Sequence, residues 1–157
     1  MYPTVVIRPA TKEDLDSAVQ LVVRLKKLNA EFDPLLQVAP DIEQAARKYL
    51  ENALNNPSSV LVVAVEGSKV VGLLKGDVED RIFYYPKYAG IIREFYILPE
   101  YRRKGIGKRL MMEGMEQLRK RGAEVIMASF PALNEIAINF YKKMGFRPVE
   151  YLFAKEV

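Results

Sequence analysis

The sequence contains no cysteine, no histidine and no tryptophan among its 157 residues. Without cysteine, the chain can build neither a disulfide framework nor a thiolate zinc site. Without histidine, imidazole is excluded as a base, nucleophile or metal ligand, which removes Ser-His-Asp triads, Cys-His pairs and most transition-metal sites. We therefore expect no metal. Any general base must be a carboxylate, a lysine, a tyrosine or a water molecule.

The chain also lacks long apolar runs, since none approaches the roughly 20 residues of a membrane span. Its N-terminal stretch MYPTVVIRPA lacks the basic-then-apolar order of a signal peptide. We therefore expect a cytoplasmic protein without a membrane partner. Half of the residues are hydrophobic, so residues 1–157 can form a single domain with a full core. The net charge of +4 is mild for a nucleic-acid-binding protein, and a coenzyme with several phosphates explains it equally well.

The stretch from Ile91 to Leu118 predicts a β-strand, a glycine loop and an amphipathic helix. Ile91 to Leu98 is rich in β-branched and aromatic residues, and Pro99 removes a ladder donor and ends the strand. From Gly107 onward, apolar residues recur at helical spacing, and Gly122 stands where a left-handed C-cap would end the helix. We expect the chemistry of the protein at this strand-to-helix corner.

The glycine loop predicts an anion site. Gly105 and Gly107 leave the backbone uncrowded, so several N–H groups can converge on one anion. The helix start adds about half a positive charge, so we expect the ligand of this site to be a phosphate or pyrophosphate. Four basic residues surround the same point: Arg102, Arg103, Lys104 and Lys108. A tight turn with a solvated basic face is the alternative interpretation.

The loop does not fit the two commonest phosphate motifs. A P-loop needs four residues between its glycines and Ser or Thr after its Lys, whereas Arg109 follows Lys108 here. A dinucleotide fingerprint needs a third glycine where Leu110 stands. The remaining pattern, Arg-x-x-Gly-x-Gly after a proline-terminated strand, resembles the general N-acetyltransferase (GNAT) superfamily. In that family the pattern binds the pyrophosphate of acetyl-CoA.

A second segment, Asn134 to Phe146, is similar to the other GNAT signature, Asn-x-x-Ala-x-x-hydrophobic-Tyr-x-x-hydrophobic-Gly-Phe. Taken alone, it predicts only a capped helix that ends at Gly145. Two motifs in the family's order make a chance match improbable. The resemblance covers Val60 to Phe146 well, whereas the two helices before it match only in type and order.

The remaining segments alternate between strand and helix patterns. Helices are expected after Thr11, after Asp41 and after Asn134, and strands at Val5 to Ile7, Val60 to Val65, Val70 to Val78, Val125 to Ala128, and finally at Phe146 and Tyr151 to Ala154. A helical crossover should make Val125 to Ala128 parallel to Ile91 to Leu98. With the resemblance, this predicts an α+β fold of three layers. Its mixed, mostly antiparallel central sheet would have about six or seven strands, with helices on both faces.

The resemblance implies roles for individual residues. Ile97 and Leu98 would offer backbone groups to the pantetheine arm and the acetyl carbonyl, because the family's fourth and fifth strands splay apart there. Asn134 would contact the coenzyme near that arm, and Tyr141 would protonate the departing CoA thiolate, since an ordinary tyrosine pKa near 10 keeps it protonated. The pyrophosphate would be held by Arg102, Arg103, Lys104, Gly105, Ile106, Gly107 and Lys108.

The general base is left open. Family members attack the thioester directly with a neutral amine and often use a Glu on the fourth strand, or a water chain, to remove the proton. Ile91 or Arg93 aligns with that position here, and neither is a carboxylate. Strand alternation puts Arg93 and Phe95 on one face and Glu94 and Tyr96 on the other. Glu94 or an ordered water would take the proton, while pairing with a neighbouring Lys or Arg is an equal alternative for Glu94.

Three functions are consistent with these patterns. The first is an N-acetyltransferase that uses acetyl-CoA and an amine, either a small molecule or a protein amino group. The second is a non-catalytic acyl-CoA sensor, and the third is a small basic nucleotide- or RNA-binding domain. The acceptor's identity, a homodimer and the role of the aromatic loop from Phe83 to Tyr88 stay open. No stacking aromatics on a sheet favour a nucleic-acid partner.

Overall fold

The computed structural model describes residues 4–157, so the first three residues of the N-terminal stretch lie outside it. The chain runs through β1 (Val5–Pro9), η1 (Lys12–Asp14), α1 (Leu15–Asn29), η2 (Pro34–Leu36), α2 (Ile42–Asn55), β2 (Ser59–Glu66), β3 (Lys69–Asp80), β4 (Tyr88–Ile97), η3 (Pro99–Tyr101), α3 (Ile106–Lys120), β5 (Val125–Ala128) and α4 (Glu135–Lys143). Each helix and strand expected before Phe146 is present in this order.

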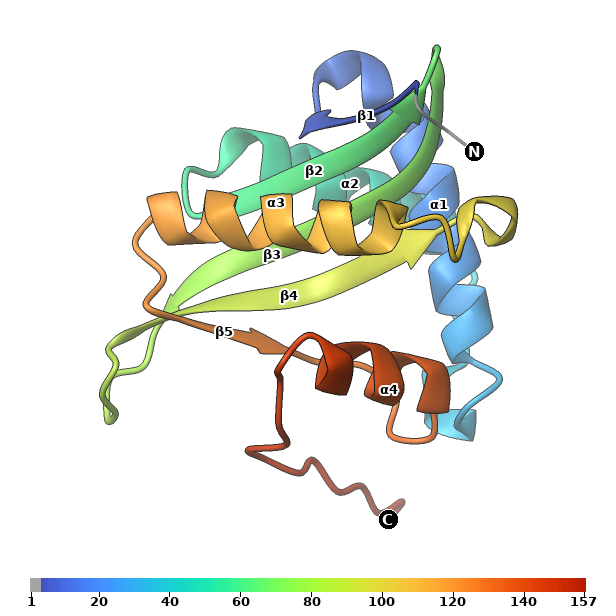
Figure 1. Cartoon of the computed structure of the whole chain (residues 1–157). Helices are drawn as coiled ribbons and strands as arrows, with labels where there is room; N and C mark the ends of the chain where they lie inside the picture. Colours follow the sequence, from blue (N-terminus) through green and yellow to red (C-terminus); the bar gives the residue numbers. More distant parts are fainter. Residues whose placement is uncertain (1–3) are drawn as a thin grey trace.

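The strands form one sheet in the order β1-β2-β3-β4-β5 (Figure 1). The first four are antiparallel to their neighbours, and β5 is parallel to β4, as the helical crossover predicts. The β4–β5 pairing extends only from Ala89 with Val125 to Ile92 with Ala128. Within residues 4–157, the second half of β4 therefore has no strand partner on the β5 side, and the two backbones diverge there and leave a gap between the strands (Figure 1).

Helices cover both faces of the sheet, which confirms the three-layer arrangement. α1 and α2 pack on each other and on one face, while α3 crosses the other face (Figure 1). Gly114 lets α3 lie close to the sheet, because a Cβ at this position would be 2.5 Å from Cδ1 of Leu74 on β3. The core between the layers includes the apolar run of β2, where Val60 to Val65 are all buried.

The prediction of strands after α4 was wrong. Phe146 contributes its N–H to the carbonyl of Tyr141, and residues 147–157 contain no strand and extend away from the sheet (Figure 1). Tyr151 is 77% exposed, Leu152 99% and Phe153 89%. The pattern of this tail favours a strand, but a strand exists only where a neighbouring edge accepts its hydrogen bonds. The sheet accordingly has five strands within the described residues.

The alternation expected along β4 is interrupted by a bulge. Lys75 pairs with Glu94 and the next residue of β3, Gly76, pairs with Ile92, so Arg93 is an extra residue in β4. A bulge re-aims the side chains that flank it. Arg93 and Glu94, predicted to lie on opposite faces, both join polar contacts on the side of α1 and α2.

None of the helices within residues 4–157 combines the length and the apolar character that crossing a bilayer requires.

Candidate functional site

The glycine loop leads from the end of β4 into the N-terminus of α3. Gly105 occupies the N-cap position with a φ of 79°, and no side chain of the described residues 4–157 caps the helix. The N–H of Arg109 donates to the carbonyl of Gly105, so the N–H groups of Ile106, Gly107 and Lys108 have no acceptor within the helix. The first turn of α3 also carries no acidic residue. These features match an anion site whose ligand comes from outside the chain.

The loop also contains a strained non-glycine residue, which the sequence did not reveal. Arg103 has a φ of 62°, a left-handed conformation that costs a non-glycine residue about 1 to 2 kcal/mol. Left-handed residues near each other turn successive N–H groups toward one concave side. Strain of this kind persists where the surroundings impose it, and it clusters at ligand sites.

The end of β4 lies beside this loop. The N–H of Leu98 donates to Val71 of β3, and its carbonyl accepts from Tyr101, so the backbone of Leu98 is bonded within the chain. Since backbone groups alternate along a strand, those of Ile97 point away from β3, toward the gap. Nε of Arg102 donates to the carbonyl of Ile97 at 2.9 Å. The N–H of Ile97 is thus the group at the strand end that faces the gap.

Arg102 itself folds back along β4. In addition to its bond with Ile97, its guanidinium lies over the ring of Tyr96, 5.3 Å from the ring centroid. An anion in the loop would therefore meet the backbone of Arg102 more readily than its side chain. Lys108 lies in the first turn of α3, so its charge reinforces the positive end of that helix.

Tyr141 on α4 is held by three aromatic rings. It stacks on Phe130 with centroids 4.9 Å apart and makes edge contacts with Phe140 at 5.5 Å and Phe146 at 5.2 Å. Only 6% of Tyr141 is exposed, and its hydroxyl has no hydrogen-bond partner within residues 4–157. Burial raises the pKa of Tyr141 well above the usual value, so the hydroxyl keeps its proton and can donate a hydrogen bond.

α4 and the glycine loop meet on the same face of β4. A Cβ on Gly107 would lie 3.6 Å from Cζ of Phe95 on β4 and 3.8 Å from Cε1 of Phe140 on α4. At the start of α4, Oδ1 of Asn134 accepts from the N–H of Ala137 and caps the helix. A contact between Asn134 and a coenzyme would therefore come from its side-chain NH2 group.

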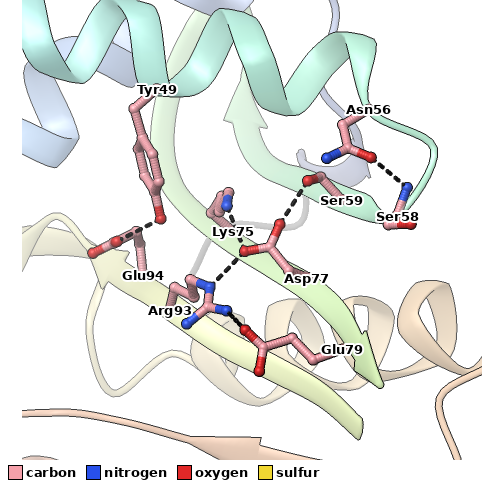
Figure 2. A network of polar contacts seen from close by, with 9 residues as sticks. All are labelled: Tyr49, Asn56, Ser58, Ser59, Lys75, Asp77, Glu79, Arg93 and Glu94. Carbon is pink, nitrogen blue, oxygen red and sulfur yellow. Dashed lines mark hydrogen bonds and ion pairs between the residues drawn. The ribbon is translucent and has the colours of Figure 1, made fainter. Parts of the chain in front are cut away.

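Glu94 lies on the opposite face of β4. Its Oε1 accepts from Nζ of Lys26 on α1 at 2.6 Å, and its Oε2 accepts from the hydroxyl of Tyr49 on α2 at 2.8 Å. Burial, followed by the negative charge of Glu94, raises the pKa of Tyr49 far above its usual value, so this hydroxyl remains a donor. Figure 2 shows Tyr49 reaching down to Glu94 from the helix above the sheet.

Asp77 on β3 forms the centre of a second group of contacts on that face (Figure 2). Its Oδ1 accepts from Ser59, and its Oδ2 accepts from Lys75 and Arg93 at 2.6 and 2.5 Å. Burial opposes ionisation of Asp77, but these three hydrogen bonds outweigh it and hold its pKa below the usual value. Arg93 also pairs with Glu79. Lys75 lies over the ring of Tyr49 at 4.4 Å, which links the two groups.

The structure thus divides the predicted site residues between two faces of one strand. The glycine loop, the strand end at Ile97 and the helix bearing Tyr141 lie toward α3 and α4, whereas Glu94 lies toward α1 and α2. The sequence interpretation missed Lys26 and Tyr49. Lys26 follows Val22 by four positions and so lies on the same, inward face of its helix. A cation on that apolar face was the signal that could have indicated a buried anionic partner.

The comparisons with known proteins concern the family and the fold of the chain. Residues 24–146 match the family model described as the acetyltransferase (GNAT) family. The chain is 27% identical over 155 residues to the aminoalkylphosphonate N-acetyltransferase of Salmonella typhimurium, covering 99% of this chain and 93% of the relative.

Two solved structures have a similar fold. One is a predicted acetyltransferase of Clostridium acetobutylicum with acetyl-CoA, with a TM-score of 0.79 and 20% identity over 97% of this chain and 96% of that one. The other is the aminoglycoside 6'-N-acetyltransferase AAC(6')-IG of Acinetobacter haemolyticus, with a TM-score of 0.75 and 17% identity over 97% and 99%. At these identities the likeness concerns the fold.

Proposed function

Because the chain belongs to the GNAT acetyltransferase family, we propose that it transfers the acetyl group of acetyl-CoA to a primary amine by direct attack. One observation carries the proposal. The uncapped N-terminus of α3 and its glycine loop open beside the segment of β4 that has parted from β5. A phosphate group held at the loop would place an attached arm along that free strand edge.

The residues of the loop fit the pyrophosphate of the coenzyme. The N–H groups of Ile106, Gly107 and Lys108 lack helical acceptors, and the left-handed residues Arg103 and Gly105 shape the turn before them. The basic residues predicted for this role, Arg102, Arg103, Lys104 and Lys108, belong to that loop and to the first turn of α3, although the guanidinium of Arg102 folds back onto Ile97 and Tyr96. In this proposal the N–H of Ile97 donates to the acetyl carbonyl, and Asn134 contacts the pantetheine arm.

Tyr141 serves as the acid in the proposed reaction. The amine nitrogen forms a bond to the carbonyl carbon, the carbon–sulfur bond breaks, and the sulfur leaves as a thiolate. Tyr141 donates a hydrogen bond to that sulfur as its charge develops, transfers its proton, and later recovers one from solvent. The three rings around Tyr141 fix the direction of its hydroxyl, so donor and acceptor need no rearrangement during the reaction.

In the proposed reaction, Glu94 binds the amine substrate and takes up its proton. It lies one residue from Phe95, on the face of β4 away from the glycine loop, so an amine bound there would meet the thioester across the gap. The proton that the ammonium loses goes to Glu94 directly or through an ordered water. Holding both reactants in line can itself supply several kcal/mol, about 7 or more in well-oriented reactions, so no covalent enzyme intermediate is needed.

The names of the similar proteins give different classes of amine substrate. The Salmonella typhimurium relative is named for aminoalkylphosphonates, and the Acinetobacter haemolyticus structure is of an aminoglycoside acetyltransferase. Incubation of this protein with acetyl-CoA and a panel of amines, read as release of free CoA, tests the proposal. Amine-dependent release supports the enzyme, whereas tight acetyl-CoA binding without release for any amine would indicate a sensor.

We also propose a cytoplasmic homodimer in which the tail after α4 pairs with the free edge of β5 in a second copy. The tail exposes Tyr151, Leu152 and Phe153, and β5 ends the sheet on that side. An exposed strand edge and an unpaired apolar segment of the same chain complement each other. Sedimentation should show a dimer that becomes monomeric when residues 150–157 are deleted, and a monomeric intact chain would contradict this assembly.

A further inference from the structure

Lys26 and Glu94 form an ion pair whose two charges are anchored very differently. Glu94 is 5% exposed, lies within β4 and is also held by the hydroxyl of Tyr49. The side chain of Lys26 is 35% exposed and comes from the last turn of α1. The carboxylate is therefore fixed inside the protein, while the ammonium reaches it from the solvent side.

The ammonium of Lys26 can move away more easily than the carboxylate can. Within residues 4–157 it has Glu94 as its single hydrogen-bonding partner, and a lysine has a flexible four-carbon stem. Glu94, in contrast, would leave Tyr49 without an acceptor if it moved. In this ion pair the carboxylate of Glu94 is therefore fixed, whereas the ammonium of Lys26 is mobile.

Glu94 has unused hydrogen-bond acceptor capacity. A carboxylate offers about four acceptor positions, and two of those of Glu94 are used. Asp77, a half-buried carboxylate on this face, already accepts from Ser59, Lys75 and Arg93. Of these two carboxylates, Glu94 therefore has the greater remaining capacity to accept hydrogen bonds from a substrate ammonium.

The charge balance of the pair selects the acceptor. A purely cationic amine at Glu94 would displace Lys26, whose ammonium would then lose its one hydrogen-bonding partner within residues 4–157 and be compensated by solvent alone. An amine that also carries an acidic group would give Lys26 a new partner. Both charges of the pair would then stay compensated, and two ion pairs would replace one.

We propose that the Lys26–Glu94 ion pair is a template for a small zwitterionic acceptor, whose ammonium binds Glu94 and whose carboxylate or phosphonate binds Lys26. The inference rests on the proposed acetyl transfer and adds the class of acceptor. Lys26 is a specificity-determining residue in this account, acting on substrate binding rather than on the reacting atoms. Tyr49 positions Glu94 for it.

The test compares acceptors of similar length with and without an acidic group. Rates of CoA release would be measured for the full chain with saturating acetyl-CoA and β-alanine, 2-aminoethylphosphonate or ethanolamine. The wild type should favour the two acids over ethanolamine by about tenfold or more in kcat/KM, the effect of one charge-assisted hydrogen bond. Lys26→Met should lose this preference through a higher KM for the acids, with kcat little changed.

Lys27→Met is the matched control, because Lys27 is an exposed cation one position along the same helix and should keep the preference. Unchanged acetyl-CoA affinity by calorimetry shows that a variant is folded, and Lys26→Gln replaces Lys26→Met if the latter is not. The proposal is overturned if the wild type uses ethanolamine as well as the acids, or if both Lys26 variants keep the preference. Failure of the wild type to bind acetyl-CoA would instead overturn the acetyl transfer itself.

Discussion

Phe95 of β4 and Phe140 of α4 stack with their ring centroids 5.2 Å apart and their planes at 26°. Phe95 lies two residues beyond the bulge at Arg93, on the part of β4 that β5 no longer accompanies. The next residue along α4 is Tyr141, whose ring also contacts Phe140. The stack therefore fixes the distance between the proposed acid and the strand edge along which the thioester would lie.

Replacing Tyr141 with Phe tests the role of its hydroxyl. The three ring contacts should survive, so the fold and the affinity for acetyl-CoA should stay nearly unchanged. Loss of the proton donor should lower kcat by about tenfold or more, within the range for general acids. Steady-state rates and acetyl-CoA titration measure the two quantities. Tyr151→Phe, in the exposed tail, is the control, and turnover of Tyr141→Phe equal to the wild type would remove this hydroxyl from the mechanism.

Replacing Gly105 with Leu tests the glycine loop. A Cβ at Gly105 meets no atom within 4 Å, so the cost to the fold is the strain of a positive φ, about 1 to 2 kcal/mol. A side chain and a shifted turn should nevertheless weaken acetyl-CoA binding by at least about tenfold, because the N–H groups of the first turn of α3 would no longer converge. Isothermal titration gives the affinity and urea denaturation gives the stability.

Gly122→Leu is a matched control for that experiment. Gly122 also has a positive φ, 105°, and open space around its Cβ position, but it lies at the far end of α3. The two variants should lose similar stability, while only Gly105→Leu should lose acetyl-CoA affinity. Equal affinities of the two variants for acetyl-CoA would refute the proposed diphosphate site at the glycine loop.

Two hydrogen-bonded aspartates, the buried Asp14 and the half-buried Asp77, predict how stability depends on pH. A hydrogen bond from Arg8 lowers the pKa of Asp14 despite burial, and the pKa of Asp77 is likewise below its usual value. The unfolded chain therefore binds more protons than the folded chain in the acid range, and the free energy of unfolding falls as the pH drops below about 4, the ordinary aspartate pKa.

Asp14→Asn should weaken this acid dependence, because the side chain that accepts from Arg8 and from the N–H of Thr11 would no longer titrate. Urea denaturation at a series of pH values between 2 and 7 measures the effect. The exposed residue Asp16 offers a control, and Asp16→Asn should leave the profile unchanged. A wild-type profile that is flat across this range would contradict the assignment.

The corner around the glycine loop could be predicted from the sequence because its requirements are local. Pro99 ends a strand, the closely spaced Gly105 and Gly107 leave the backbone uncrowded before an amphipathic helix, and both consequences follow from neighbouring residues. The surroundings of Glu94 could not be predicted in this way. Lys26 and Tyr49 lie 68 and 45 residues from it along the chain, and they meet it only after the helices pack on the sheet.

The bulge and the tail show the same limit for strands. Whether Arg93 continues the alternation depends on where Lys75 and Gly76 of β3 pair, which no pattern within β4 contains. The segment from Tyr151 to Phe153 has the composition of a strand but is not one, because strand formation needs a partner edge. Local patterns fix which segments can form strands, and pairing decides which of them do.

The central claim is that backbone amides of the loop and of α3 hold the diphosphate of acetyl-CoA. Calorimetric titration of the wild-type protein with acetyl-CoA and with S-acetylpantetheine, which lacks the diphosphate, tests it most directly. The account predicts binding of one acetyl-CoA per chain and an affinity at least about a hundredfold lower for S-acetylpantetheine, since several charge-assisted hydrogen bonds would be missing. Equal affinities for the two compounds, or no heat with acetyl-CoA, would contradict it.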